Sequence, residues 1–302
     1  MDYILEMDML NEASQFDMGT AIVEQFELSA IKEGFSKESV RKVFRKIIET
    51  VTGWATNLKN WAAKIFKPVI DKYKTHRISK LKAKFENGKT VPLNATMYFV
   101  NVKVYNTALE ESDSINNNAL KAMTFLDTNM TKFLYQTDGN KLDRESFGRS
   151  IKTDKSQLKP PVNKIKDIND LLEKQFIARM DRQMLMQLLD NEKRVDKCIE
   201  AVDNSTKNTL NLYTGINQKA SKYENMMSRD ENGDIPGTND VIHAYNILLK
   251  SVALGGQLLN SCKAALVRTI SEYTGVVSKL MKVIGVEAKP ASSAGPEPTP
   301  ES

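Results

Sequence analysis

The sequence of 302 residues has little cysteine, histidine, glycine and proline. Two cysteines, Cys198 and Cys262, are too few for a disulfide framework or a cysteine-rich zinc site, and they favour a reducing environment. Two histidines, His76 and His243, argue against a histidine-based metal or proton-relay site. The low content of fourteen glycines and nine prolines favours long helices over a turn-rich β architecture.

Membrane-spanning and secreted proteins have features that this sequence lacks. No apolar run reaches the roughly 18 residues of a membrane-spanning helix. The N-terminus is acidic where a secretory signal would be basic, so we expect no export signal. No serine, cysteine or lysine nucleophile stands beside a recognisable base. We therefore expect no enzymatic activity, no cofactor and no metal site.

The charge of the chain is distributed unevenly. The formal net charge is +5, but residues 1–33 contain eight acidic residues and one lysine, so they carry −7 and residues 34–302 carry +12. Residues 41–90 hold fourteen lysines and arginines against three acids, a net charge of +11. This asymmetry indicates a removable or regulatory terminus, or a basic surface for a polyanion. The alternative is that the acidic segment simply packs on the basic helix.

The basic segment predicts one long amphipathic helix, roughly residues 37–73. Its apolar residues recur at the 3–4 spacing of one helix face, from Val40 to Tyr73. Ser36 is the predicted N-cap, and Pro68 is expected to kink or end the helix because proline has no backbone N–H. The opposite face supplies the candidate phosphate contacts, which are Arg41, Lys42, Arg45, Lys46, Lys59, Lys64, Lys67 and Lys72.

Three interpretations of this helix remain open. In the first, the basic face binds double-stranded DNA through its phosphates, without base readout. In the second, the helix inserts at a membrane interface, with Trp54 and Trp61 near the edge of its apolar arc. In the third, the helix is part of a bundle, with its apolar face in the core and its basic face solvated. The helix alone does not choose among them.

Residues 91–287 predict an all-α fold, an elongated helical bundle with a long antiparallel helical hairpin in the C-terminal half. The hairpin arms are expected at about 162–227 and 239–285, joined by a polar turn. Within the first arm, apolar and small residues over 199–227 alternate steps of three and four. Such a seam is typical of a coiled coil, and it offers a surface for a homo-oligomer.

Two other segments complete the expected organisation. Residues 97–105 alternate as a strand would, but no partner strand is evident, so we interpret about 93–136 as helical. Residues 288–302 are rich in Pro, Ser and Glu, and we expect this tail to be disordered. The chain then divides into an acidic leader (1–33), a cationic helical region (34–90), the bundle and the tail.

The leader contains a repeated motif. Four of its five glutamates have Ile or Leu two positions earlier, whereas the remaining 269 residues contain four such triplets. A small residue follows two of the leader triplets, giving Leu10-Asn11-Glu12-Ala13 and Ile31-Lys32-Glu33-Gly34. This pattern resembles the sites cut by the prohead protease of T-even-like tailed bacteriophages, which are Leu or Ile, any residue, Glu, and then a cut before a small residue.

In that group of phages, scaffold and internal head proteins carry acidic N-terminal targeting peptides that are removed as the head matures. The resemblance implies a non-enzymatic virion protein of the head interior, present in the host cytoplasm during assembly. Cleavage would fall at Ile31, Glu33 and Gly34, with a secondary site at Leu10, Glu12 and Ala13. The implied partners are capsid or scaffold proteins, the head-maturation protease and packaged double-stranded DNA.

The resemblance covers the leader, and the helical body resembles no family. Two alternative functions therefore remain open. One is a membrane-interface-active or host-interacting helical protein. The other is a purely structural bundle that oligomerises through its seam.

Overall fold

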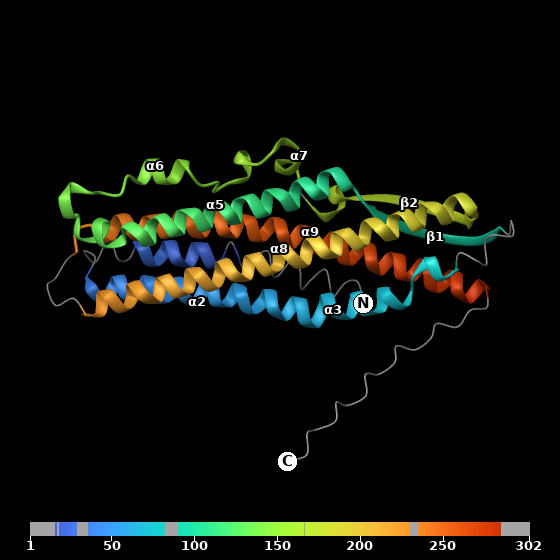
Figure 1. Ribbon diagram of the computed structural model, residues 1–302, viewed down its shortest axis with the longest axis horizontal. Coiled ribbons are helices and arrows are strands. Elements are labelled where there is room, and N and C mark those ends of the chain that lie inside the picture. The colour runs from blue at the N-terminus through green and yellow to red at the C-terminus, as the bar shows by residue number, and fades with distance from the viewer. Residues whose placement is uncertain are drawn as a thin grey trace, which may run out of the picture.

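The computed structural model describes residues 16, 18–28, 36–81, 90–165, 167–229 and 235–284. Long helices run side by side along one axis and form an elongated bundle (Figure 1). They are α2 (Lys37–Trp61), α3 (Lys67–Thr75), α5 (Val102–Tyr135), α8 (Arg182–Arg229) and α9 (Thr238–Ile284). The predicted all-α bundle with a long antiparallel hairpin is confirmed, because α8 and α9 pack antiparallel. The predicted disordered tail lies outside the described residues.

Shorter elements connect the long helices. Residues 18–28 form a further helix, and the connecting segments include a π-helix and several 3-10 turns. The short elements are a π-helix (Ala62–Phe66), 3-10 turns (Ile78–Leu81, Thr137–Gly139, Lys155–Gln157 and Ile168–Leu171), α6 (Arg144–Arg149) and α7 (Pro160–Asn163).

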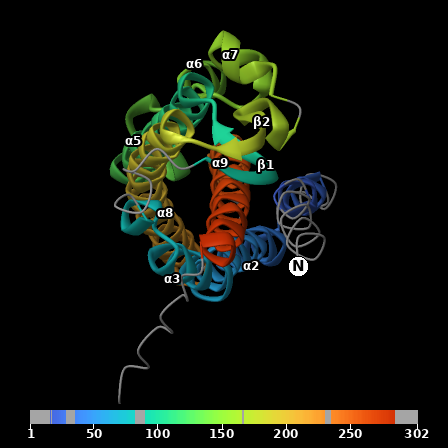
Figure 2. The same cartoon turned by 90° about the vertical axis from the view of Figure 1, so that its right-hand side faces the viewer.

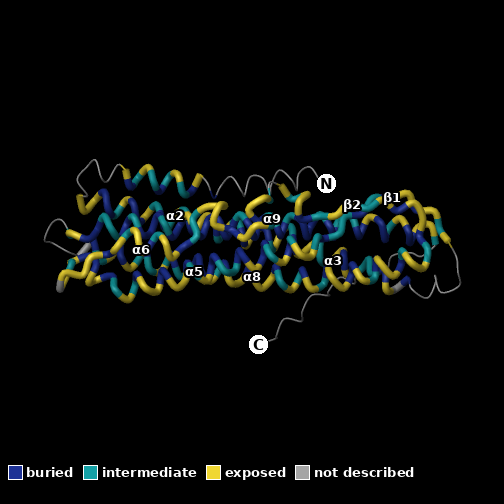
Figure 3. Tube along the Cα trace, turned by 90° about the horizontal axis from the view of Figure 1, so that it is seen from above, coloured by how far each residue is buried: buried dark blue, intermediate teal, exposed yellow. Residues whose placement is uncertain are grey.

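Helix α9 is the central element of the core. It is buried along most of its length, with α5 and α8 on one side and residues 18–28 on the other (Figures 2 and 3). A helix that is apolar on nearly all sides is expected at such a position. Gly255 lets α5 approach closely, since a Cβ there would lie 2.7 Å from Asn116 Oδ1. Ser112 adds a hydrogen bond from its hydroxyl to the Gly255 carbonyl, at 2.8 Å.

The structure corrects the expected helix at 93–136. Strand β1 (Val91–Val100) comes first, and α5 then begins after an Asn101 N-cap. The partner strand is β2 (Leu172–Met180), which pairs antiparallel with β1 so that Val91 faces Met180. Alternate side chains of β1, such as Leu93 and Met97, are buried, as a half-buried strand requires. The strand was missed because its partner lies more than seventy residues further along the chain.

The same pairing corrects the first hairpin arm, which begins at Arg182 and not near residue 162. Phe176 lies on β2 with 65% of its surface exposed. The seam over 199–227 forms as predicted, but it is covered by the chain's own helices. Tyr213 packs on Trp54 of α2 with ring centroids 5.9 Å apart, and Thr209 accepts a hydrogen bond from Asn116 of α5 at 3.0 Å. The seam is therefore used for intramolecular packing, and it does not offer a free surface for a homo-oligomer.

Candidate nucleic-acid interface

The basic segment begins at the predicted cap. The Ser36 hydroxyl oxygen accepts a hydrogen bond from the Ser39 backbone N–H at 3.2 Å, and α2 starts at Lys37. The apolar arc of α2 faces α8 and the core. Trp54 and Trp61 are 4% and 2% exposed. Neither indole is therefore at the surface of this fold, where contact with a membrane interface would require it.

Pro68 neither ends the helix nor breaks it, because a π-helical turn precedes it. In this turn the Lys67 N–H donates to the Ala62 carbonyl, five residues back. The wider turn brings Trp61 and Phe66 into a stack with centroids 4.7 Å apart, which α-helical spacing would not allow. The buried ammonium of Lys263 lies 4.0 Å from the Trp61 ring centroid and donates to Asn260 Oδ1 at 2.7 Å. Helix α3 therefore continues α2 with a shifted face.

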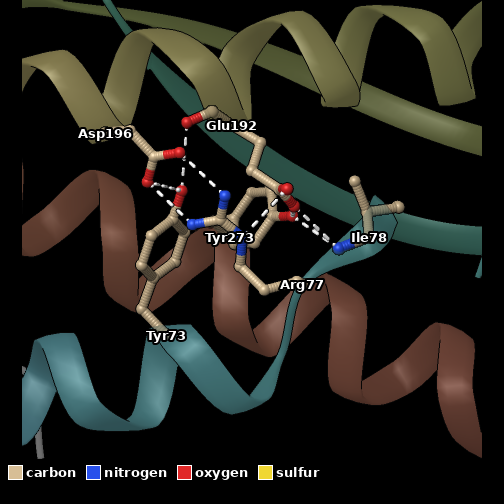
Figure 4. Close-up of polar contacts among 6 residues, drawn as sticks. All are labelled: Tyr73, Arg77, Ile78, Glu192, Asp196 and Tyr273. Carbon is tan, nitrogen blue, oxygen red and sulfur yellow. Dashed lines mark hydrogen bonds and ion pairs between the residues drawn. The ribbon is translucent and has the colours of Figure 1, made fainter. Parts of the chain in front are cut away.

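A cluster of polar side chains ties the end of α3 to α8 and α9 (Figure 4). Arg77 reaches both oxygens of Asp196 at 2.7 Å, and its Nε lies 2.9 Å from Glu192 Oε1. The other Glu192 oxygen accepts from the Ile78 backbone N–H at 2.8 Å and from the Tyr273 hydroxyl. The Tyr73 hydroxyl donates to the Glu192 carbonyl at 3.1 Å and also lies 3.2 Å from Asp196. We refer to these six residues as the anchor cluster.

The electrostatics of the anchor cluster favour a structural role. Hydrogen bonding to Asp196 raises the pKa of Arg77, and burial raises the pKa values of Tyr73 and Tyr273 well above that of free tyrosine. The guanidinium thus stays charged and both phenols stay neutral across the physiological range. A bidentate guanidinium–carboxylate pair also has a defined geometry. The cluster therefore fixes the C-terminal end of the basic segment against the bundle.

The N-terminal basic residues of α2 are mostly paired with acids. Arg41 lies 3.8 Å from Glu38 and Lys46 lies 2.9 Å from Glu49. Arg45 donates to Glu224 of α8 at 2.6 Å, and this hydrogen bond raises the pKa of Arg45. Lys42 is exposed on the same part of the helix. Arg41, Arg45 and Lys46 are therefore committed to carboxylates, which weakens them as phosphate contacts.

The basic residues near the C-terminal end of this segment differ from those of early α2 in their ion pairing. Four lysines lie opposite the buried side of α2, the π-helix and α3, and we call them the lysine strip: Lys59, Lys64, Lys67 and Lys72. All four are exposed, and none forms an ion pair with another residue that the structure describes. Lys72 lies thirteen positions after Lys59, so the strip is about 20 Å long at helical rise. Asp71 is the acidic residue within it. Of the eight residues predicted to contact phosphates, these four and Lys42 are exposed and have no ion pair among the described residues.

The part of the leader that the structure describes does not cover the lysine strip. Residues 18–28 lie between α2 and α9, beside α2 at the edge of the bundle (Figure 2). Glu24 forms an ion pair with Lys250, and Glu27 lies 3.4 Å from His243 Nδ1, so both acids contact α9. Neither Glu24 nor Glu27 forms an ion pair with a described basic residue of α2. The predicted cleavage residues lie outside the described residues: Leu10, Glu12, Ala13, Ile31, Glu33 and Gly34.

Sequence reasoning did not identify the anchor cluster or the buried Lys263. Glu192 and Asp196 are four residues apart on α8, which places them on one helix face. The same face carries buried Leu188 and Val195, and this was the available signal that an acid pair points inward. Their basic partner, Arg77, is more than a hundred residues away in the chain and could not be assigned.

Searches for other kinds of site and for relatives were negative. Across the described ranges, no helix is long and apolar enough to span a bilayer. In the same residues, no three His, Cys, Asp or Glu side chains are grouped so that they could bind a metal ion. Comparisons with protein-family models, curated proteins and solved structures found no match.

Proposed function

We propose that this protein is a non-enzymatic structural component of the head of a tailed bacteriophage and that it binds packaged double-stranded DNA through the lysine strip. The observation that supports the proposal most is the strip itself. Its four exposed lysines lack ion pairs among the described residues, whereas Arg41, Arg45 and Lys46 near the start of α2 have them. Lysines without acidic partners can neutralise phosphates and release counterions.

The dimensions of the strip suit a DNA backbone. Duplex DNA carries one negative charge per ~1.7 Å of axis, both strands counted, so the ~20 Å of duplex alongside the strip carries roughly 12 phosphates, more than the four lysines need. The buried tryptophans and the anchor cluster hold the helix in place, so its side chains are presented from a fixed backbone. Contacts of this kind involve phosphates and carry no sequence information. The proposed binding is therefore non-specific and weakens with salt.

The binding test uses the full chain and a mixed-sequence DNA duplex. We expect binding at 50 mM salt that is lost progressively as the salt concentration rises, with the same affinity for unrelated sequences. Absence of binding at low salt would show that the DNA part of the proposal is wrong.

The phage part of the proposal rests on the leader. It places the protein in the head interior, with capsid or scaffold proteins and the head-maturation protease as partners. Cleavage after Glu33 would yield a product that begins at Gly34. The four triplets beyond the leader begin at Ile47, Leu109, Leu171 and Ile270, and all four of these side chains are buried, so the folded body is protected.

The processing test is co-expression with a prohead protease, followed by N-terminal sequencing and intact mass. We expect one product that begins at Gly34 and retains residues 34–302. An intact chain, or cuts within the body, would contradict the assignment.

A further inference from the structure

The helix at residues 18–28 is held in a groove between α2 and α9 in one continuous antiparallel register. Phe16 lies against Gly256, Glu24 pairs with Lys250, and Glu27 lies beside Asn246 and His243. As the numbering rises along this helix, the numbering of its α9 partners falls. A consistent register over this length indicates a specific fit between two surfaces.

The fit is closest at two glycines. A Cβ on Gly256 would lie 2.6 Å from two Phe16 ring atoms, and a Cβ on Gly19 would lie 2.7 Å from Thr50 Cγ2 of α2. The Phe16 ring packs on Trp54 with centroids 5.1 Å apart. Val23 is completely buried. The apolar side of the leader helix thus fills the groove without room for further atoms at these two points.

The polar contacts complement the apolar ones. Glu27 is buried and accepts a hydrogen bond from the Asn246 amide, with His243 Nδ1 at 3.4 Å. Glu24 is nearer to solvent and pairs with Lys250. The α9 side of the groove therefore has a cation and an amide donor spaced one turn apart, opposite two carboxylates spaced three residues apart. This arrangement selects an acidic amphipathic helix.

We propose that the α2/α9 groove is a binding site for an acidic amphipathic helix, that the leader is its resident occupant, and that the leader stays bound after the chain is cut between residues 28 and 36. All the contacts described above join side chains across the groove, so none of them needs the peptide connection. Proteolysis by itself then leaves the groove filled. Another acidic amphipathic helix then enters the groove only by displacing the leader. This inference needs neither DNA binding nor the phage protease.

The test starts from the full chain, with a recognition sequence for a site-specific protease placed within residues 29–35. The folded protein is cut, and the leader peptide is followed by size-exclusion chromatography with mass spectrometry. We expect the peptide to co-elute with the body. In a second measurement the leader carries a fluorescent label. Its release from the body in the presence of excess unlabelled peptide 1–33 gives the dissociation rate.

The chain offers a matched pair of variants on α9. Gly256→Ala places a methyl group against the Phe16 ring, whereas a Cβ at Gly275 meets nothing within 4 Å. Both substitutions raise helix propensity equally. We expect Gly256→Ala to speed leader release by at least about tenfold, in line with overpacking of a tight contact, and Gly275→Ala to leave it unchanged. Equal release from the two variants would refute the fit.

A double substitution keeps the result interpretable if Gly256→Ala also affects the body through Tyr213, which lies 3.1 Å from the added atom. Phe16→Ala removes the ring that the methyl group meets. On that background we expect Gly256→Ala to cause no further acceleration, because the clashing partner is gone. If the unsubstituted peptide elutes apart from the body, the proposal is overturned, whether or not the body stays folded.

Discussion

Removal of Lys64 and Lys67 together tests the lysine strip most directly. For a site that contacts four phosphates, the logarithm of the association constant falls with the logarithm of salt concentration at a slope of about −3.6. The double variant Lys64→Ala/Lys67→Ala keeps two contacts, which gives a slope of about −1.8. Over a fourfold rise in salt, affinity should fall about 150-fold for the unsubstituted chain and about 12-fold for the variant. Fluorescence anisotropy with a labelled duplex between 50 and 200 mM NaCl measures both slopes.

The control for this variant has the same loss of charge at another place. Lys193 and Lys207 are exposed on α8 and are paired with Asp190 and Asp203 at 3.5 and 2.6 Å. Lys193→Ala/Lys207→Ala should therefore retain the slope of about −3.6. If both double variants change the slope equally, binding follows net charge and not the strip. An unchanged slope in the Lys64/Lys67 variant would remove the strip from the interface.

Two further predictions concern stability. The hydrogen bond from Lys219 above all, together with a smaller one from Tyr223, lowers the pKa of Asp127 to about 2 against the opposing effect of burial. The stability that Asp127 contributes is thus complete above its unfolded pKa near 4 and is lost as the pH falls from about 4 to 2. Asp127→Asn should therefore lower the free energy of unfolding by about 1–2 kcal/mol at pH 7 and by almost nothing at pH 2. Urea unfolding at the two pH values measures this difference. Arg77→Ala leaves the buried Glu192 without its cation and should cost about 3–5 kcal/mol, whereas Arg149→Ala, at an exposed pair, should stay within about 0.5 kcal/mol. Equal costs for the two arginine variants, or a pH-independent cost for Asp127→Asn, would contradict the stated causes.

The parts of the fold that sequence predicts well depend on local patterns. The 3–4 spacing of apolar residues and the Ser36 cap located the start and the buried face of α2. The heptad-like steps located the buried face of α8. The hairpin turn between the two long arms followed from turn residues. Each of these signals involves neighbours within about one or two helical turns, so one sequence contains the whole of the information.

The parts that sequence missed depend on residues far apart in the chain. The pairing of β1 with β2 joins segments separated by α5 and the two short helices that follow it. The salt bridge of Arg45 with Glu224 likewise joins residues far apart in the chain. Nothing in the sequence near Arg45 shows that its guanidinium is paired with a carboxylate. The periodic pattern therefore gave eight candidate phosphate contacts, and tertiary pairing was needed to separate paired cations from exposed ones.

The positions of the leader and the lysine strip change what removal of the leader would accomplish. Shielding of the strip would require acids within about one Debye length of it, roughly 10 Å at 0.1 M salt. The described acids of the leader helix, Glu24 and Glu27, instead contact Lys250 and His243 on α9. Loss of this helix would therefore uncover the groove and its cation, while the strip is exposed with the leader helix in place. The two described acids of the leader are thus ligands of α9, and we expect the exposed strip to bind DNA with this helix in place as well as after its removal.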